Sequence, residues 1–250
     1  MDTRNDTILI TGGGSGIGKA MAEALHARGA RVIIAGRRRE PLDAVAAANP
    51  GMAVETLDVA DAADVTAFAA RVVQAHPDLN VVINNAGIMQ AEDLTADAID
   101  LNVAEQAIAI NLLGPIRLTA ALLPHLKSKA SATVVTVSSG LAFVPLTATP
   151  TYSATKAAIH SWSQSLRTQL KDTSVEVLEW APPAVATDLM PGHAENPNSM
   201  PLADFTAESL SLFEAGGADE ILVERVKFLR GAETRGDYGK VYSILNDGAH

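Results

Sequence analysis

Short apolar runs alternate along the chain with longer segments in which apolar residues recur at helical spacing. The short runs predict strands and the longer segments predict helices. Strands are predicted over residues 7–11, 31–35, 54–57, 79–83, 133–137, 175–180 and 239–245, and helices over 19–28, 41–49, 62–75, part of 98–127, 152–170 and 219–229. Strands that alternate with helices indicate a mostly parallel sheet with helices on both faces. We therefore predict a doubly wound α/β fold with seven strands.

The chain of 250 residues shows no break in composition, so we predict a single domain over residues 1–250. Its 48% hydrophobic content is ample for a core. An irregular stretch rich in Pro, Asn, Gly, His and Met follows residue 188, and we expect a substrate loop or lid over about 188–215. A surface loop without any closing motion is the alternative.

Acidic side chains outnumber basic ones by 29 to 19, which gives a net charge of −10. This charge argues against a nucleic acid or an anionic membrane as partner. The absence of cysteine from the sequence excludes disulfides, thiolate nucleophiles and cysteine-bound metals. No apolar signal core follows Met1, and no uninterrupted apolar run approaches the roughly 18 residues that span a bilayer. We expect a cytoplasmic protein.

A glycine-rich loop, Gly12-Gly-Gly-Ser-Gly-Ile-Gly18, joins the first predicted strand to the first predicted helix. A strand, a glycine loop and a helix in this order are typical of a site where a pyrophosphate meets a helix N-terminus. The residues from Gly13 to Lys19 also match the start of an ATPase phosphate loop, but Ala20 stands where that motif needs a serine or threonine for magnesium. The spacing Gly12-x-x-x-Gly16-x-Gly18 also differs from the Gly-x-Gly-x-x-Gly of the common dinucleotide fingerprint, so the loop by itself indicates a pyrophosphate site.

Three arginines, Arg37 to Arg39, follow the second predicted strand. An NAD-dependent enzyme places a carboxylate near this strand end to bind the ribose 2′-hydroxyl, whereas a guanidinium suits the 2′-phosphate of NADP. The strand end carries arginines in place of a carboxylate, so NADP(H) is favoured over NAD(H), with Arg37 as the expected contact. A solvated basic turn is the alternative.

Tyr152 and Lys156 stand four positions apart in a segment with helical spacing, so they project from the same face. A tyrosine with its ordinary pKa of about 10 is a poor proton donor or acceptor at neutral pH. A neighbouring positive charge favours the phenolate and would lower that pKa toward the range of a general acid or base. Ser139 follows a predicted strand, and its hydroxyl could hold a substrate oxygen at the same sheet edge. An exposed tyrosine–lysine pair is the alternative.

Asn111 interrupts an apolar helical segment, where an asparagine costs stability unless its amide is hydrogen-bonded. It could bind a neighbouring backbone group or hold an active-site water. The sequence contains no His-x-x-x-His or similar ligand spacing, so no metal site is expected.

In this order along the chain, the motifs resemble the short-chain dehydrogenase/reductase family over roughly residues 7–190. The matching pieces are Thr11-Gly-x-x-x-Gly-Ile-Gly18, Asp58-Val59, Asn84-Asn-Ala-Gly87, Asn111, Ser139, Tyr152-x-x-x-Lys156 and the segment 183–187. The resemblance implies a Rossmann-like fold. It also implies a carbonyl reductase or alcohol dehydrogenase that interconverts a ketone or aldehyde and an alcohol by hydride transfer.

The resemblance assigns roles to individual residues. Tyr152 would be the general acid in carbonyl reduction and the base in alcohol oxidation, while Lys156 would bind the nicotinamide ribose and lower the tyrosine pKa. Ser139 would bind the substrate carbonyl, and Asn111 would hold a water that links Lys156 to solvent. The implied dinucleotide contacts are Gly12, Ser15, Gly16, Ile17, Gly18, Arg37, Asp58, Val59, Asn85, Ala86, Gly87, Tyr152, Lys156, Val185 and Thr187.

Two positions depart from the family pattern. Ala184 replaces a glycine that is usual in the segment 183–187. Ser15 stands where many NADP-using relatives carry a basic residue, so only one of two basic signals for NADP is present.

The helical segments around Asn111 and after Tyr152 are apolar on more than one side, and such helices often pack in a dimer in this family. We expect a homodimer or homotetramer. A small carbonyl or alcohol substrate is implied, and a hydrophobic one is favoured if the pocket is apolar. The candidate pocket residues, for which core packing is the alternative, are Leu141, Phe143, Val144, Leu146, Met190 and Met200.

A catalytically silent, NADP-binding sensor on the same fold is the alternative function. The presence of Ser139, Tyr152 and Lys156 together counts against it, because a sensor needs no proton donor.

Overall fold

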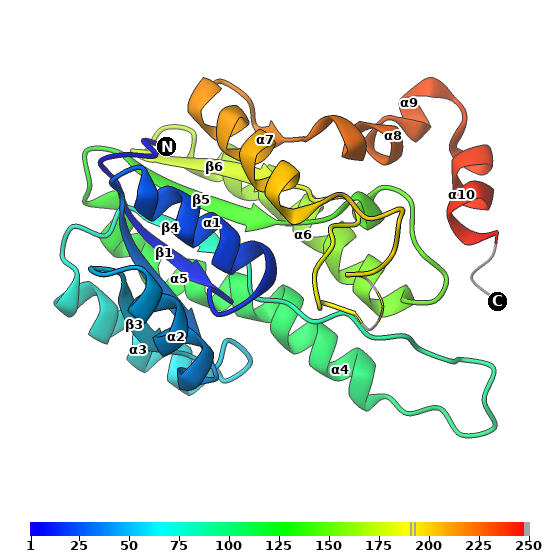
Figure 1. The fold of residues 1–250 in the computed structure, drawn as a ribbon, viewed down its shortest axis with the longest axis horizontal. Helices are drawn as coiled ribbons and strands as arrows, with labels where there is room; N and C mark the ends of the chain where they lie inside the picture. The colour runs from blue at the N-terminus through cyan, green and yellow to red at the C-terminus, as the bar shows by residue number, and fades with distance from the viewer. Residues whose placement is uncertain (191, 193, 248–250) are drawn as a thin grey trace.

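The computed structural model describes residues 1–190, 192 and 194–247. These residues form one parallel sheet of seven strands in the order β3-β2-β1-β4-β5-β6-β7 (Figure 1). The strands are β1 (Thr7–Thr11), β2 (Arg31–Gly36), β3 (Ala53–Thr56), β4 (Val81–Asn84), β5 (Ala132–Val137), β6 (Val175–Trp180) and β7 (Glu220–Ile221). The predicted doubly wound, Rossmann-like α/β fold is confirmed.

The strand order changes direction at β1. Strands β2 and β3 are added on one side of β1, where it pairs with β2, and the later strands are added on the other side, where it pairs with β4. Ligands of open α/β sheets bind at such a switch point, outside the carboxyl ends of the strands. The loops that follow β1, β2, β4 and β5 therefore meet at one edge of the sheet.

Helices cover both faces of this sheet (Figure 1). On one face, α1, α2 and α7 supply buried residues to the same cluster as Ile8, Ile10 and Ile34. On the other face, α3, α5 and α6 pack on Leu9 and Ile33. The helices are α1 (Gly16–Ala27), α2 (Arg39–Ala48), α3 (Ala62–Ala75), α4 (Asn102–Ile108), α5 (Gly114–Lys127), α6 (Pro150–Leu170), α7 (Leu202–Ala215), α8 (Lys227–Arg230), α9 (Ala232–Arg235) and α10 (Tyr238–Asn246).

The predicted apolar helix within 98–127 is a continuous stretch, Asn102–Lys127, in which a π-helical turn, η1 (Ala109–Leu113), joins α4 to α5. With a mean hydropathy of 1.5, it is long and apolar enough to cross a membrane by length and composition. Core helices of folded proteins can have the same length and composition. Leu118, Leu122 and Leu126 of α5 are fully buried against the sheet.

The C-terminal elements differ from the prediction. Residues 219–229 were expected to form a helix, but β7 lies there, followed by a short 3-10 turn, η3 (Glu224–Val226), and α8. The strand expected over 239–245 is part of helix α10. Val241, Tyr242 and Leu245 of α10 stand at helical spacing and pack together near Val144. The prediction was wrong because a short apolar run does not by itself distinguish a strand from a helix.

The segment 188–215, expected to be a substrate loop, contains α7 from Leu202 onward. Phe205 of this helix stacks on Trp180 at 5.3 Å, and Phe213 meets the same indole edge-on at 5.6 Å. Both phenylalanines are core residues, so the irregular part of the segment ends at Pro201. Within that part, Pro191 and His193 lie outside the described residues.

Candidate active site

The glycine loop brings β1, β4 and the N-terminus of α1 into close contact. Gly12 has a φ of 71°, and a Cβ on it would lie 2.9 Å from Nδ2 of Asn85. A Cβ on Gly18 would lie 2.4 Å from both that nitrogen and the Gly12 carbonyl oxygen. Side chains at either position would force β1 and β4 apart. Asn85 and Gly18 thus shape the loop itself.

Thr11, which sequence reasoning passed over as a site residue, ties the two strands together. Its hydroxyl oxygen accepts hydrogen bonds from the backbone N–H groups of Asn85 at 3.1 Å and Ala86 at 3.0 Å. The Asn85 amide donates in return to the Thr11 carbonyl at 2.9 Å. A polar residue at the end of a buried strand was the signal that could have identified it.

A cleft opens beside this loop, between the ends of β1, β2 and β4. Seven of the expected dinucleotide contacts line it, namely Gly12, Ser15, Arg37, Asp58, Val59, Ala86 and Gly87. The other eight do not line this cleft, namely Gly16, Ile17, Gly18, Asn85, Tyr152, Lys156, Val185 and Thr187. Thr187 still approaches the loop, since a Cβ on Gly16 would lie 3.7 Å from its side chain.

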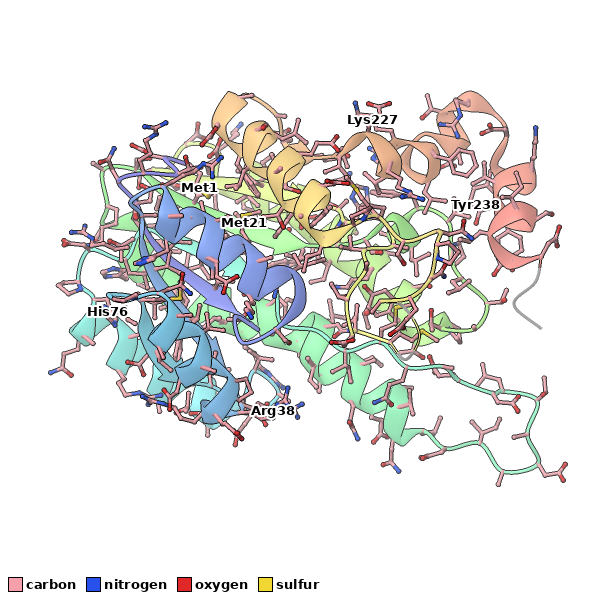
Figure 2. All side chains as sticks on the ribbon, viewed as in Figure 1. Met1, Met21, Arg38, His76, Lys227 and Tyr238 are labelled. Atoms are coloured by element: carbon pink, nitrogen blue, oxygen red, sulfur yellow. The ribbon has the colours of Figure 1, made fainter. Side chains whose placement is uncertain are left out.

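The arginines after β2 divide into two kinds. Arg39 is paired with Asp43 on α2 at 2.8 Å. Arg37 and Arg38 are exposed, line the cleft, and make no side-chain hydrogen bond to any residue that the structure describes. Figure 2 shows Arg38 beside the start of α2. Two available guanidinium groups therefore face the cleft, of which sequence reasoning selected one.

These residues fit a dinucleotide with a 2′-phosphate. The helix α1 has no acidic residue in its first turn and no side-chain cap, so its N-terminal N–H groups can receive an anion. Only glycines fit the close approach at Gly12 and Gly18, and Arg37 and Arg38 supply positive charge at the far end of the cleft.

Ser139, Tyr152 and Lys156 meet at the carboxyl edge of the sheet, all of them buried. Ser139 begins a 3-10 turn, η2 (Gly140–Ala142), and its hydroxyl accepts from the Leu141 N–H at 3.1 Å. Tyr152 and Lys156 lie one turn apart on α6, with the ammonium 5.5 Å from the phenol ring centroid. The Lys156 ammonium also donates to the carbonyl of Val137, at the end of β5, at 2.8 Å.

Burial controls the ionisation of this pair. It raises the pKa of Tyr152 to about 12, although a hydrogen bond with the Ser139 side chain acts in the opposite direction. Burial also lowers the pKa of Lys156 to about 8. The expected lowering of the tyrosine pKa is therefore not seen in the cofactor-free protein, because desolvation of the phenolate is the largest influence on that pKa.

Asn111 sits in the π-helical turn η1 and is satisfied by the backbone. Its side-chain oxygen accepts from the Ile88 N–H, and its amide donates to the Ile88 carbonyl, both at 2.9 Å. A Cβ on Gly87 would lie 3.3 Å from this side-chain oxygen and 3.8 Å from the Lys156 ammonium nitrogen. Asn111 and Lys156 therefore both approach Gly87, and the water that the resemblance places at Asn111 stays a prediction.

Glu92 was missed by the sequence analysis. Its carboxylate accepts from both the backbone N–H of Thr151 at 2.9 Å and the Thr151 hydroxyl at 2.7 Å, in the first turn of α6. Thr149, the residue that begins the helix, makes no capping bond of its own. A carboxylate from a loop far away in sequence thus caps the helix that carries Tyr152. Spacing along the chain gives no signal for such a contact.

The candidate pocket residues divide between core and surface. Val144 and Met200 are buried in core clusters. Leu141, Phe143, Leu146 and Met190 are partly exposed. Met200 also pairs with Val185 in a parallel bridge, which holds the segment 183–187 against the start of α7.

Fold and site together define a dinucleotide-binding protein of the α/β class. The sequence pattern of the short chain dehydrogenase family matches residues 6–198. "Uncharacterized oxidoreductase DltE" of Bacillus subtilis is 40% identical over 249 residues, which cover 98% of each chain. The chain therefore belongs to the short chain dehydrogenase family of oxidoreductases.

Solved structures agree with this assignment. A short chain dehydrogenase from Burkholderia cenocepacia in complex with NADP superposes with a TM-score of 0.83 at 26% identity, covering 98% of this chain and 99% of that one. A short-chain dehydrogenase from Sphingobium yanoikuyae in complex with NADPH gives 0.79 at 26% identity, covering 98% of each chain. A third, from Burkholderia phymatum in complex with NAD, shares the fold at 19% identity, with a TM-score of 0.81 and 96% of each chain covered.

The buried lysine predicts an unusual pH dependence of stability. In the folded protein the buried Lys156 side chain is charged below about pH 8. In the unfolded chain the same side chain keeps its proton up to a pKa of 10.5. Stability should therefore rise as the pH increases through this window. Lys156→Met should raise the free energy of unfolding of the cofactor-free protein at pH 7 by up to about 3 kcal/mol.

Urea unfolding at pH 7, 8 and 9 tests this expectation. The gain from Lys156→Met should shrink as the pH rises, while Lys171→Met, at an exposed position on the end of the same helix, should change little at any pH. A gain that stays constant with pH would show that the lysine charge is not its cause.

Proposed function

We propose that this protein is an NADP(H)-dependent oxidoreductase that interconverts a ketone or aldehyde and an alcohol, with Tyr152 as general acid and base. The observation that carries the proposal is the meeting of Ser139, Tyr152 and Lys156 at the sheet edge that also holds the glycine loop. A phenol, a hydroxyl and an ammonium at this place suit a reaction in which charge develops on a carbonyl oxygen.

In carbonyl reduction, Ser139 and Tyr152 bind the substrate oxygen, and Tyr152 supplies its proton. A bound nicotinamide supplies or accepts the hydride at the carbonyl carbon. Tyr152 holds its proton at neutral pH because its pKa is about 12, so it can donate that proton to the oxygen as negative charge forms there. Ser139 donates a second hydrogen bond to the same oxygen. Lys156 in its charged form stabilises the phenolate that remains.

Asn111 has a proposed role in returning the proton. Its side-chain amide binds the Ile88 carbonyl, and its side-chain oxygen and the Lys156 ammonium both lie close to Gly87. A water held there would link Lys156, and through it Tyr152, to solvent. With a pKa of about 8, Lys156 can release and regain a proton near neutral pH.

NADP(H) is the proposed cofactor because Arg37 and Arg38 line the cleft where a 2′-phosphate would lie. The neighbours from Burkholderia cenocepacia and Sphingobium yanoikuyae, which bind NADP and NADPH, support this choice. A small hydrophobic carbonyl compound or alcohol is the proposed substrate, since Leu141, whose N–H binds the Ser139 hydroxyl, remains partly exposed, as do Phe143 and Leu146 in the same loop.

We also propose a cytoplasmic homodimer or homotetramer, with no nucleic acid or membrane as partner. The loop before α4 extends away from the sheet (Figure 1) and exposes Leu94, Ile99 and Leu101, while α4 exposes Ile108. Exposed apolar side chains gathered on one segment favour contact with another protein surface.

The first experiment follows the loss of reduced-nicotinamide absorbance with NADPH or NADH and a panel of ketones, aldehydes and diketones. Turnover with any member supports the oxidoreductase, and the ratio of rates with the two cofactors tests the preference for NADP(H). NADPH binding without turnover over a broad panel would favour the silent sensor instead.

Tyr152→Phe removes only the phenol hydroxyl. It should lower kcat by at least about a hundredfold because no other proton donor replaces it, while NADPH affinity changes only a few fold. Steady-state kinetics and NADPH fluorescence titration measure the two effects. Retained turnover would contradict the role of Tyr152.

Arg37→Ala should weaken NADPH binding by about tenfold or more and leave NADH binding nearly unchanged, because only NADPH carries the 2′-phosphate. Arg39→Ala is the matched control, since Arg39 already pairs with Asp43. Equal weakening of both cofactors by Arg37→Ala would place the 2′-phosphate elsewhere.

The oligomer is tested by light scattering at micromolar concentration, where a mass of at least two chains is expected. Leu101→Ser and Ile108→Ser should shift the protein toward monomer because they remove exposed apolar contacts. A monomer for the unmodified protein would contradict this part of the proposal.

A further inference from the structure

A buried carboxylate that the proposed chemistry does not use lies directly behind Ser139. Glu179, in β6, has no exposed surface. One of its carboxylate oxygens accepts a hydrogen bond from the Ser138 hydroxyl at 2.5 Å, and the other lies 2.7 Å from Nδ1 of His160. A charge buried in this way costs several kcal/mol unless its partners are well placed. The two contacts supply that compensation.

His160 is oriented for this contact. The side-chain nitrogen of Gln164 lies 3.1 Å from Nε2 of the imidazole, one helical turn further along α6. If the amide donates to Nε2, the proton of the neutral ring is on Nδ1 and points at Glu179. The pair therefore joins β6 to α6 through a directed hydrogen bond.

A second charged pair, Glu220 and Arg230, lies next to the turn that follows Ser139. Glu220 of β7 accepts two hydrogen bonds from Arg230 of α8, at 2.7 and 3.0 Å. The Arg230 guanidinium lies 4.8 Å from the ring centroid of Phe143, and the edge of that ring meets His160 at 4.9 Å. Phe143 thus contacts both Arg230 and His160.

His160, Glu179 and Glu220 each place one ligand atom within 4.8 Å of the others, which is also a spacing that a metal ion could use. Their polar atoms, however, already have protein partners. Both oxygens of Glu220 bind Arg230, and both oxygens of Glu179 bind Ser138 and His160. The arrangement therefore favours an internal network over an open set of ligands.

This network joins the two elements that carry the candidate catalytic residues. Ser138 and Ser139 follow the end of β5, and the backbone at Ser139 is extended, so the side chains of the two neighbours point to opposite sides. The Ser138 hydroxyl thus binds Glu179 while Ser139 faces Tyr152. His160 lies one turn beyond Lys156 on α6. Glu179 therefore contacts the end of β5 and the catalytic helix at once.

We propose that Glu179, paired with His160, is a positioning residue that holds Ser138, and through it Ser139, in register with Tyr152 and Lys156. The inference rests on the proposed function, because it assigns Glu179 to the same site. Glu179 touches neither substrate nor cofactor. It acts by keeping the Ser139 hydroxyl at the distance from Tyr152 that the substrate oxygen requires.

Glu179→Gln tests the proposal. A glutamine keeps an acceptor for Ser138 but replaces the carboxylate oxygen beside Nδ1 of His160 with an N–H donor, so the contact with the ring is lost unless the imidazole moves its proton to Nε2 and the Gln164 amide turns over. We expect kcat to fall about tenfold to a hundredfold, with the KM for NADPH unchanged because the cofactor cleft lies beyond Ser139. Glu176→Gln, at an exposed position on the same strand, should change neither constant.

Ser138→Ala provides a second, milder variant that removes only the hydroxyl bonded to Glu179. It should lower kcat to a similar extent, and the double variant Ser138→Ala/Glu179→Gln should be no slower than the slower single variant. A kcat within twofold of the unmodified protein for both single variants would overturn the proposal, as would fully multiplicative losses in the double variant.

Hydrogen exchange of the cofactor-free protein gives a readout that does not need turnover. Glu179→Gln should speed exchange of the backbone amides of residues 139–143 and leave the glycine loop unchanged. This response in a protein that turns over nothing would support the positioning role and refute the proposed reaction. Unchanged exchange at residues 139–143 would refute the positioning role, whether or not the protein is an active enzyme.

Discussion

The burial of the Lys156 ammonium is the constraint on which the rest of the site depends. A charged amine with 4% exposure needs a close acceptor, and it finds the carbonyl of Val137 at 2.8 Å. That contact fixes α6 against the carboxyl end of β5. Because Tyr152 lies one turn earlier on the same helix, the position of the phenol relative to Ser139 follows from it. A displacement of α6 along the sheet would leave the ammonium without a partner.

Three other polar contacts hold the same helix and its surroundings, and each comes from a different part of the chain. Glu92 caps the first turn of α6, Asn111 binds the loop after Gly87, and Glu179 binds His160 in the middle of the helix. Buried polar groups are costly in any arrangement that leaves them unpaired. Several of them acting together therefore favour one position of the helix, and with it one geometry of the three catalytic candidates.

The C-terminal part of the chain packs against the loop between Ser139 and Tyr152. Asn246 of α10 accepts from the Thr147 N–H at 2.7 Å and donates to the Pro145 carbonyl at 3.2 Å, so it holds the loop between Ser139 and Tyr152. Leu229 packs so tightly on Gly140 that a Cβ there would lie 2.7 Å from it. The family pattern ends at residue 198, so these contacts come from the part of the chain that the family does not define. Proteins that share the family pattern can therefore differ in these contacts.

The sequence by itself determined six of the seven strands, the glycine loop and the catalytic candidates, because each depends on residues close together in the chain. Buried strands, a loop that only glycines fit, and a tyrosine one helical turn from a lysine are all local patterns. The tertiary structure alone decided the last strand, which has only two residues, Glu220 and Ile221, and owes its existence to pairing with β6. It alone also placed Glu92, Glu179 and Asn246, whose partners lie far away along the chain. It reversed the expected change in the tyrosine pKa as well, since desolvation depends on what surrounds a side chain and not on its neighbours in sequence.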